Sequence, residues 1–300
     1  MRNDKWTTEN IPDLTGKVII VTGGNSGLGF ESVKAFAEKG AEVILACRSV
    51  EKGKKAKSEI DSGNIKGNIT VKELDLQDFG SIEKFAEGIH KKHSKIDVLL
   101  NNAGIMGTPY FLTGEGLEGQ MGVNHFGPYM LTGLLLDLII KTPKSRVVNV
   151  SSGAHRFGKM DFSNLLYENG KQYAPMKAYN RSKLSNLLFT YELQRKFEEH
   201  KIDTIVVGAH PGAAISDLTR HTPVIKFLLP VIAQTTARGA LPQIRACVGI
   251  DVKGGDFYGP HKMATGFPVS IISSKGSHNK EDAKKLWDIS EQITKVKYFN

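Results

Sequence analysis

A tyrosine and a lysine four positions apart are the first residues in this 300-residue chain whose spacing suggests chemistry. Tyr179 and Lys183 stand in the amphipathic, helix-forming stretch AYNRSKLSNLLFTYELQRKF, so both side chains share one helix face. A free tyrosine has a pKa of about 10, too high for efficient proton exchange near neutral pH. A lysine ammonium beside it favours the phenolate and lowers that pKa. We therefore predict that Tyr179 donates a proton to a substrate oxygen.

Tyr173 and Lys177 have the same spacing, but Pro175 lies between them. A proline inside a helix removes a hydrogen bond and clashes with the preceding turn. We therefore prefer Tyr179 and Lys183 as the catalytic pair.

A glycine-rich turn, TGGNSGLG (22–29), follows the β-branched run KVIIVTG (17–23) and precedes FESVKAFAEKG (30–40), which has helical apolar spacing. The glycines let the turn be tight and let backbone N–H groups approach a pyrophosphate at the positive end of the helix. A plain strand-to-helix turn is the alternative, but the strand before and the helix after favour a dinucleotide site. The predicted cradle consists of Gly23, Asn25, Ser26, Gly27, Leu28 and Gly29.

Apolar runs typical of buried strands alternate with helical patterns along the chain. The strand-like runs occupy 17–23, 41–48, 69–76, 96–104, 146–152, 203–212 and 267–273. About seven strands with helices between them predict an α/β fold, a Rossmann-type doubly wound parallel sheet with helices on both faces. No linker interrupts the pattern, so we expect a single domain over 1–300. The apolar, helical stretch 213–250 is predicted to form a lid over the substrate site.

The second strand, AEVILACR (41–48), would end beside the adenosine ribose of a dinucleotide in such a fold. Enzymes that prefer NAD(H) place an acidic side chain there, but this chain has Cys47. The guanidinium of Arg48 can hold a 2′-phosphate through two hydrogen bonds, and Ser49 and Lys52 could add a hydroxyl and a positive charge. We therefore predict NADP(H) as the cofactor in preference to NAD(H). The alternative is an exposed strand-end arginine without a ligand.

The order of the motifs resembles the short-chain dehydrogenase/reductase family. The T-G-x-x-x-G-x-G spacing matches that family and differs from the G-x-x-G-x-x-G of its extended members. NNAG (101–104), YNRSK (179–183) and HPG (210–212) follow in the family's order. The resemblance covers about 15–275 and implies a hydride transfer between a nicotinamide cofactor and a carbonyl or alcohol.

The resemblance implies roles for further residues. Asn124 in GVNHFGPY would position a water and Lys183, although a buried, hydrogen-bonded asparagine explains the sequence equally well. Ser152, the second serine ending RVVNVSS, would hydrogen-bond the substrate oxygen, with a turn-forming serine as the alternative. Tyr179 and Lys183 would also contact the cofactor. The other expected cofactor contacts are Asp75, Leu76, Asn102, Ala103, Gly104, Pro211 and Gly212.

The stretch between Ser152 and Tyr179 is about twice as long as in many family members. This stretch, HRFGKMDFSNLLYENGKQYAPMKA (155–178), and the ACRS turn (46–49) resemble the retinol dehydrogenase-like branch, which is related to protochlorophyllide reductases. That branch acts on lipophilic carbonyls. The chain lacks the N-terminal anchoring helix of many retinol enzymes and the cysteines expected of light-dependent protochlorophyllide reductase. We therefore expect a lipophilic substrate without assigning retinoid specificity.

The composition is that of a globular protein, with 40% hydrophobic and 24% charged residues. No apolar run approaches the ~20 residues of a membrane-spanning helix. The N-terminal stretch MRNDKWTTENIPDLTGK has no apolar signal-peptide core, and two cysteines cannot build a disulfide framework. We therefore expect a cytoplasmic protein without integral membrane association.

A net charge of +9 raises the alternative of a nucleic-acid-binding protein. The lysine clusters at 51–57 and 91–95 have the pattern of solvated helix ends, and no nucleic-acid-binding signature accompanies them. No histidine stands at metal-ligand spacing, so we predict neither nucleic acid nor metal as a partner. A non-catalytic dinucleotide sensor on the same fold is the other alternative, and such a protein often lacks the tyrosine or the lysine. A homodimer through the apolar helices at 129–139 and 184–193 is a further implication of the resemblance.

Overall fold

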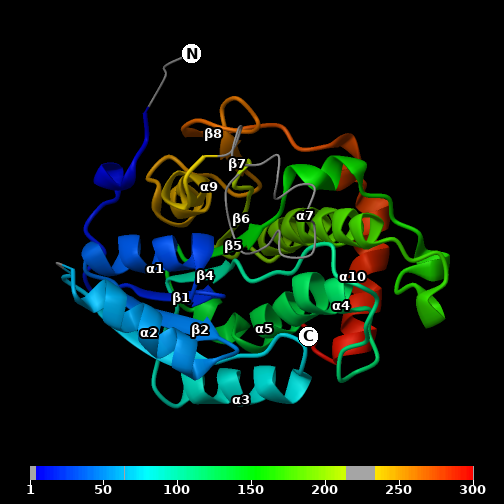
Figure 1. Cartoon of the computed structure of the whole chain (residues 1–300), viewed down its shortest axis with the longest axis horizontal. Helices are drawn as coiled ribbons and strands as arrows, with labels where there is room; N and C mark the ends of the chain where they lie inside the picture. The colour runs from blue at the N-terminus through cyan, green and yellow to red at the C-terminus, as the bar shows by residue number, and fades with distance from the viewer. Residues whose placement is uncertain (1–4, 64, 214–233, 300) are drawn as a thin grey trace.

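Eight strands form one sheet in the part of the chain that the computed structural model describes, residues 5–63, 65–213 and 234–299. Figure 1 shows the sheet running through the molecule between two layers of helices. The strands are β1 (Val18–Thr22), β2 (Glu42–Cys47), β3 (Asn68–Glu73), β4 (Val98–Asn101), β5 (Arg146–Val150), β6 (Ile205–Ala209), β7 (Phe257–Pro260) and β8 (Pro268–Ser270). Their order is β3-β2-β1-β4-β5-β6-β7-β8, and every neighbouring pair is parallel except β7 and β8.

Helices and short turns connect the strands. The α-helices are α1 (Gly27–Glu38), α2 (Val50–Asp61), α3 (Phe79–His90), α4 (Gly119–Met121), α5 (Gly127–Leu134), α6 (Leu136–Ile140), α7 (Pro175–Glu199), α9 (Thr236–Val248) and α10 (Lys280–Thr294). Short 3₁₀ segments are η1 (Thr8–Asn10), η3 (Gly153–Phe157), η4 (Phe162–Asn164), η5 (Glu168–Gly170) and η7 (Lys275–His278). The segment η2 (Gly122–Phe126) is a π-helical turn between α4 and α5.

Each central strand divides its side chains between two cores. In β1, Ile19 and Val21 belong to one core, whereas Val18 and Ile20 belong to the other. The reason is that successive side chains of a strand point to opposite faces of the sheet. Helices α1, α2 and α9 cover the first face, and α3, α5 and α7 cover the second. Strands buried on both faces read as continuous apolar runs, which is why the sequence marks them clearly.

The doubly wound α/β fold predicted from the sequence is confirmed, with one more strand than expected. Strands β1, β2, β4, β5 and β6 lie within their predicted runs, and β3 begins one residue before the predicted run 69–76. The seventh run, 267–273, forms only the short β8, which is antiparallel to β7. The sequence pattern misses β7, because its four residues FYGP are few and include a glycine and a proline.

The predicted lid over 213–250 needs a correction at its C-terminal end. Residues 214–233 lie outside the described residues, so the lid stays a prediction there. Helix α9 is a core helix: every residue from Gly239 to Val248 is buried, and the helix packs against α1, β6 and β7. Its apolar side chains therefore stabilise the sheet and do not cover the substrate site.

The C-terminal helix α10 packs against α7 and runs across it in the view of Figure 1. The Trp287 ring contacts Tyr129 of α5 and Phe189 of α7, with ring centroids 5.3 and 6.0 Å apart. The apolar side chains of α5 and α7 that we expected at a homodimer interface are thus largely buried within the chain. A homodimer stays a prediction without an assigned surface.

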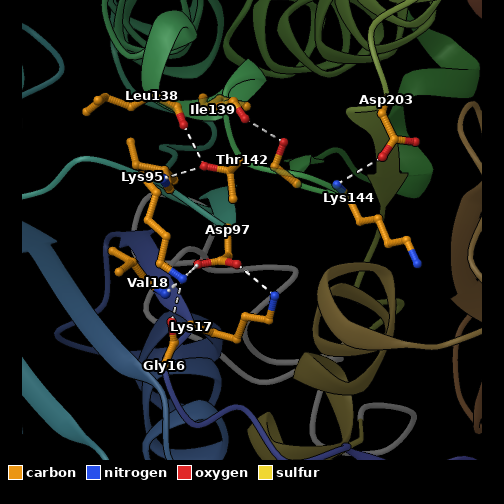
Figure 2. A network of polar contacts seen from close by, with 12 residues as sticks. Gly16, Lys17, Val18, Lys95, Asp97, Leu138, Ile139, Thr142, Lys144 and Asp203 are labelled. Carbon is orange, nitrogen blue, oxygen red and sulfur yellow. Dashed lines mark hydrogen bonds and ion pairs between the residues drawn. The ribbon is translucent and has the colours of Figure 1, made fainter.

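A buried carboxylate joins the strands at the edge of the sheet that receives their amino ends (Figure 2). Asp97, which precedes β4, accepts hydrogen bonds from Lys17 Nζ at 2.8 Å and from the Val18 N–H at 2.9 Å. Lys95 Nζ lies 3.1 Å from Asp97 Oδ2, the same oxygen that accepts the Val18 N–H. Burial acts to raise the pKa of Asp97, but the hydrogen bonds from Lys17, Val18 and Lys95 outweigh burial and hold this pKa below its usual value.

We predict that Asp97→Asn lowers the free energy of unfolding by about 1.5–3 kcal/mol at neutral pH, the range for hydrogen bonds to a charged group. Because the folded pKa is depressed, this stabilisation is present above the ordinary carboxyl pKa of about 4 and is lost as the pH falls through the folded value. Urea unfolding of variant and unmodified protein at neutral and strongly acidic pH measures both effects.

The control is Asp203→Asn at the same edge of the sheet, where an exposed carboxylate accepts only the Lys144 N–H at 3.2 Å. This variant should change stability by less than about 0.5 kcal/mol. Equal losses in the two variants, or a loss in Asp97→Asn that does not depend on pH, would contradict the assignment.

Candidate active site

The strand order reverses between β1 and β4, and a crevice forms at this point. From β1 the sheet extends through β2 to β3 on one side and through β4 to β5 on the other. Such a switch point leaves a ligand-sized opening at the carboxyl ends of the strands. A cavity of about 380 Å³ lies there. The predicted residues that line it are Gly23, Asn25, Ser26, Gly27, Leu28, Gly29, Arg48, Asp75, Leu76, Asn102, Ala103, Gly104, Tyr179, Lys183 and Pro211.

Further residues line the cavity, of which Ser49 and Lys52 had been considered beside Arg48 and the others had not been predicted. These further residues are Thr22, Cys47, Ser49, Lys52, Leu74, Gln77, Ile105, Met106, Thr108, Val123, Val150 and Ser151. Most of them directly precede or follow a predicted site residue at a strand end. Extending each strand-end motif by two or three positions would have found most of them, because the carboxyl ends of parallel strands share one edge; Lys52, Thr108 and Val123 lie beyond such an extension.

The glycine-rich loop packs against the end of β4 with no room for a side chain. A Cβ atom at Gly29 would lie 2.2 Å from the Gly23 carbonyl oxygen and 2.7 Å from Asn102 Nδ2. Asn102 Nδ2 donates a hydrogen bond to the Thr22 carbonyl at 2.8 Å. The Thr22 hydroxyl accepts the N–H groups of Asn102 and Ala103, each at 3.0 Å. The loop is therefore fixed to β4 by hydrogen bonds from both sides.

The start of α1 suits a bound phosphate group. Gly23 and Gly27 have φ angles of +67° and +56°, a backbone conformation that glycine adopts without strain. Ser26 precedes the helix, and within the described residues its side chain does not cap the first turn. Free N–H groups at a helix N-terminus bind anions. These residues fit the pyrophosphate of a dinucleotide.

Arg48 lies at the rim of the cavity with its side chain exposed. Among the described residues it has no hydrogen-bond or ion-pair partner, whereas its neighbours are engaged. Cys47 Sγ donates to the Ser49 carbonyl at 3.2 Å, and the Ser49 hydroxyl caps α2 by accepting the Lys52 N–H at 3.3 Å. Arg48 is thus a guanidinium free to meet an anion beside the end of β2.

Tyr179 and Lys183 lie on α7 and reach the cavity from the side of β5. Ser152 hydrogen-bonds the Tyr179 side chain. The Ser151 hydroxyl instead donates to the Lys183 carbonyl at 2.7 Å and is buried. Ser151 lines the cavity but uses its hydroxyl within the protein, whereas Ser152 is the partner of the Tyr179 side chain and is not among the lining residues.

The pKa values of the pair differ from the sequence-based expectation. Burial raises the pKa of Tyr179 to about 12, and the hydrogen bond from Ser152 acts in the opposite direction. Burial lowers the pKa of Lys183 to about 8. Lys183 Nζ donates to the Val150 carbonyl at 3.0 Å and lies 5.8 Å from the centroid of the Tyr179 ring. Burial outweighs the hydrogen bond from Ser152, so the pKa of Tyr179 lies above its ordinary value, whereas we expected Lys183 to lower it.

Asn124 lies fully buried in the π-helical turn η2. Its Oδ1 accepts the Ile105 N–H at 2.8 Å, and its Nδ2 donates to the Ile105 carbonyl and to the Ser182 hydroxyl, each at 2.9 Å. A Cβ at Gly104 would lie 3.0 Å from Asn124 Oδ1 and 3.2 Å from Lys183 Nζ. Asn124 is thus a satisfied buried amide and also a neighbour of Lys183. Both amide hydrogens are used by the protein, so the side chain primarily fixes the chain after β4.

Tyr173 lies outside α7, which begins at Pro175. Its hydroxyl donates to the Thr108 carbonyl at 2.8 Å and accepts Gln120 Nε2 at 2.9 Å. Tyr173 therefore ties the stretch before α7 to the loop after β4. This agrees with the prediction that Pro175 keeps Tyr173 and Lys177 from acting as a pair.

The remaining predicted contacts stand at the ends of β3 and β6. Asp75 Oδ1 accepts the Gln77 N–H at 3.0 Å and turns the chain toward the cavity. Gly212 has a φ of +70°, and its N–H donates to His210 Nδ1 at 3.1 Å. Gly212 itself does not line the cavity, although Pro211 does. In the described part of the chain, no three metal-binding side chains gather at one point.

Comparisons with known proteins agree with this geometry. A family model described as short chain dehydrogenase matches residues 17–223. Human retinol dehydrogenase 11 is 39% identical over 282 residues, which cover 92% of this chain and 85% of that protein. Chicken WW domain-containing oxidoreductase is 38% identical over 293 residues, covering 94% of this chain and 69% of that protein.

Solved structures show the same fold. The crystal structure of an uncharacterized protein from Mycobacterium paratuberculosis superposes with a TM-score of 0.84 and 37% identity, covering 99% of this chain and all of that one. A short chain dehydrogenase from Shigella flexneri, solved in complex with NADP, gives a TM-score of 0.64 at 23% identity and covers 82% of this chain and 97% of its own.

We predict that Gly29→Ala weakens dinucleotide binding by at least ~10-fold, because the new Cβ forces the loop away from β4 and misplaces its N–H groups. The fluorescence change of NADPH on binding measures this affinity. The control is Gly276→Ala, where no atom lies within 4 Å of the added Cβ. Unchanged affinity in Gly29→Ala would show that the loop does not hold the ligand.

Proposed function

The chain belongs to the short-chain dehydrogenase family, and from this we propose that it transfers a hydride between NADP(H) and the carbonyl or alcohol group of a lipophilic small molecule. The observation that carries the proposal is the shared cavity. One cavity is lined both by the glycine cradle of α1 and by Tyr179 and Lys183. A dinucleotide with its pyrophosphate on the cradle would therefore place its reactive ring in the cavity that the two side chains line.

When bound, the nicotinamide supplies the hydride. Tyr179 keeps its proton at neutral pH, because its pKa is raised to about 12, and donates that proton to the carbonyl oxygen of the substrate. Ser152 hydrogen-bonds the same oxygen and polarises the carbonyl. The Tyr179 phenolate is then reprotonated by the Lys183 ammonium, whose pKa of about 8 makes it the stronger acid. Asn124 holds the chain at Ile105, which keeps Lys183 beside Gly104.

We propose NADP(H) as the preferred cofactor on the basis of Arg48. Its exposed guanidinium at the end of β2 stands where a 2′-phosphate would lie, and the residue before it, Cys47, carries no negative charge to repel a phosphate. Lys52 lines the same rim. The Shigella flexneri relative was solved with NADP, which is consistent with this choice.

We propose a lipophilic substrate because apolar side chains contribute to the lining of the cavity that Tyr179 enters. Ile105, Met106 and Val123 are among them. Several similar proteins are named as retinol dehydrogenases, whose substrate name denotes a lipophilic alcohol.

We also propose a cytoplasmic location, since both cysteines are free and buried. Among the described residues, no helix has the length and apolar character needed to cross a bilayer.

The proposed function predicts that Tyr179→Phe lowers turnover by at least ~100-fold, because it removes the proton donor and keeps the ring. The affinity for NADPH should change little. The decrease in NADPH absorbance with a panel of aldehydes and ketones measures turnover. The matched control is Tyr173→Phe, which should lose about 1 kcal/mol of stability with its two hydrogen bonds but keep its turnover.

Turnover that survives Tyr179→Phe, or fails in Tyr173→Phe alone, would refute the assignment. Unmodified protein that binds NADPH but reduces no carbonyl would favour the alternative of a non-catalytic dinucleotide sensor.

For the cofactor preference, we predict that Arg48→Ala weakens NADPH binding by about 1.5–3 kcal/mol and leaves NADH nearly unaffected. The reason is that only NADPH carries the 2′-phosphate. The control is Lys55→Ala on α2, because Lys55 pairs with Glu51 at 3.0 Å and does not line the cavity. Michaelis constants for NADPH and NADH that are equal in the unmodified enzyme would contradict the prediction without any variant.

A further inference from the structure

A buried histidine, His155, lies three residues after Ser152, and each of its two ring nitrogen atoms forms a hydrogen bond with a backbone group. His155 is 1% exposed. Its Nδ1 lies 2.6 Å from the Ser152 carbonyl oxygen, and its Nε2 lies 3.0 Å from the Ser274 backbone nitrogen. A carbonyl can only accept and a backbone N–H can only donate, so Nδ1 carries the proton and Nε2 the lone pair. The two partners therefore fix one neutral tautomer.

The ring is held from several directions. It packs edge-on against Phe257 of β7, with centroids 5.4 Å apart. Arg156 binds the same segment after β8, because its Nη2 donates to the Ile272 carbonyl at 2.6 Å. The Ser273 hydroxyl lies 2.7 Å from the hydroxyl of Tyr191 on α7. His155 thus joins the turn after β5 to a segment that is itself anchored to the fold.

Burial favours the neutral ring. It lowers the pKa of His155 and outweighs the hydrogen bond to Ser152, which acts to raise this pKa; the nearby Arg156 and His278 act in the same direction as burial. His210 also interacts electrostatically with His155. A neutral His155 keeps both hydrogen bonds over the neutral pH range, so the Ser152 carbonyl is held in one place.

The position of this carbonyl decides where the Ser152 hydroxyl points. The hydroxyl accepts the Ala154 N–H at 3.2 Å and also hydrogen-bonds Tyr179. The Ser152 carbonyl accepts the His155 N–H at 3.1 Å and the His155 ring from a second direction. Hydrogen bonds within this turn therefore hold both the hydroxyl and the carbonyl of Ser152.

We propose that His155 is a positioning residue for the reaction: its Nδ1–H fixes the Ser152 carbonyl and thereby aims the Ser152 hydroxyl at the oxygen that Tyr179 protonates. This inference rests on the proposed function. The bond from Nδ1 acts on catalysis, whereas the bond to Ser274 holds the ring and contributes to stability.

Two substitutions separate the two nitrogen atoms of the ring. In His155→Asn, the amide nitrogen takes the place of Nδ1 and keeps the donor to Ser152. In His155→Gln, the amide oxygen reaches toward Nε2 and keeps the acceptor for Ser274. We expect His155→Gln to lower kcat by ~10-fold and His155→Asn by less than ~3-fold, because small displacements of a polarising group are costly. NADPH affinity should be unchanged in both, and their melting temperatures should fall by similar amounts.

Ser274→Pro is the control that leaves the ring intact. Ser274 has a φ of −69°, which proline adopts, so this change removes the N–H that Nε2 accepts together with the Ser274 hydroxyl, which does not cap the following turn. We expect a lower melting temperature and an unchanged kcat. A loss of kcat in Ser274→Pro equal to that in His155→Gln, or equal losses in Asn and Gln, would overturn the proposal and leave the proposed function intact.

A measurement on the unmodified protein gives an independent check. Nuclear magnetic resonance of isotope-labelled histidine should show His155 protonated at Nδ1 and not at Nε2. The opposite tautomer would overturn the proposal even if the variants failed to fold. Absence of turnover in the unmodified protein with every carbonyl would instead overturn the proposed function and this inference with it.

Discussion

The close contact between the glycine-rich loop and the end of β4 is the constraint on which the rest of the site depends. A Cβ at Gly29 would overlap the Gly23 carbonyl, so the loop lies against Asn102 only because no side chain intervenes. Two residues after Asn102, Gly104 allows the same segment to approach Lys183. One short stretch of chain thus contacts both the glycine-rich loop and Lys183, the lysine of the proposed mechanism. The two ends of the cavity are therefore coupled through the main chain after β4.

Burial around this stretch gives the proton transfer its direction. Desolvation raises the pKa of Tyr179 to about 12 and lowers that of Lys183 to about 8. The two groups would otherwise have similar pKa values. After the shift, Lys183 is the more acidic of the two groups, so under the proposed function a phenolate formed at Tyr179 would take its proton from Lys183.

Most of the sheet and the glycine cradle could be predicted from the sequence because their signals are local. Continuous apolar runs mark β1 to β6, and glycine spacing marks the turn before α1. The pairing of Tyr179 with Lys183 follows from helical spacing alone. β7, the burial of α9 and the choice of Ser152 over Ser151 could not be read from local patterns. They depend on packing and hydrogen bonds between distant segments. The π-helical turn that contains Asn124 depends on the same interactions, and only the family resemblance had singled out Asn124 itself.

Transfer of deuterium from NADPH that carries the label on its reactive carbon tests the central claim most directly. Unmodified protein is mixed with this cofactor and a set of lipophilic aldehydes and ketones, and the products are analysed by mass spectrometry. The account predicts an alcohol with deuterium on the former carbonyl carbon, and almost none when Tyr179→Phe replaces the unmodified protein. Labelled NADPH that binds with ordinary affinity but keeps its deuterium with every carbonyl would contradict the account.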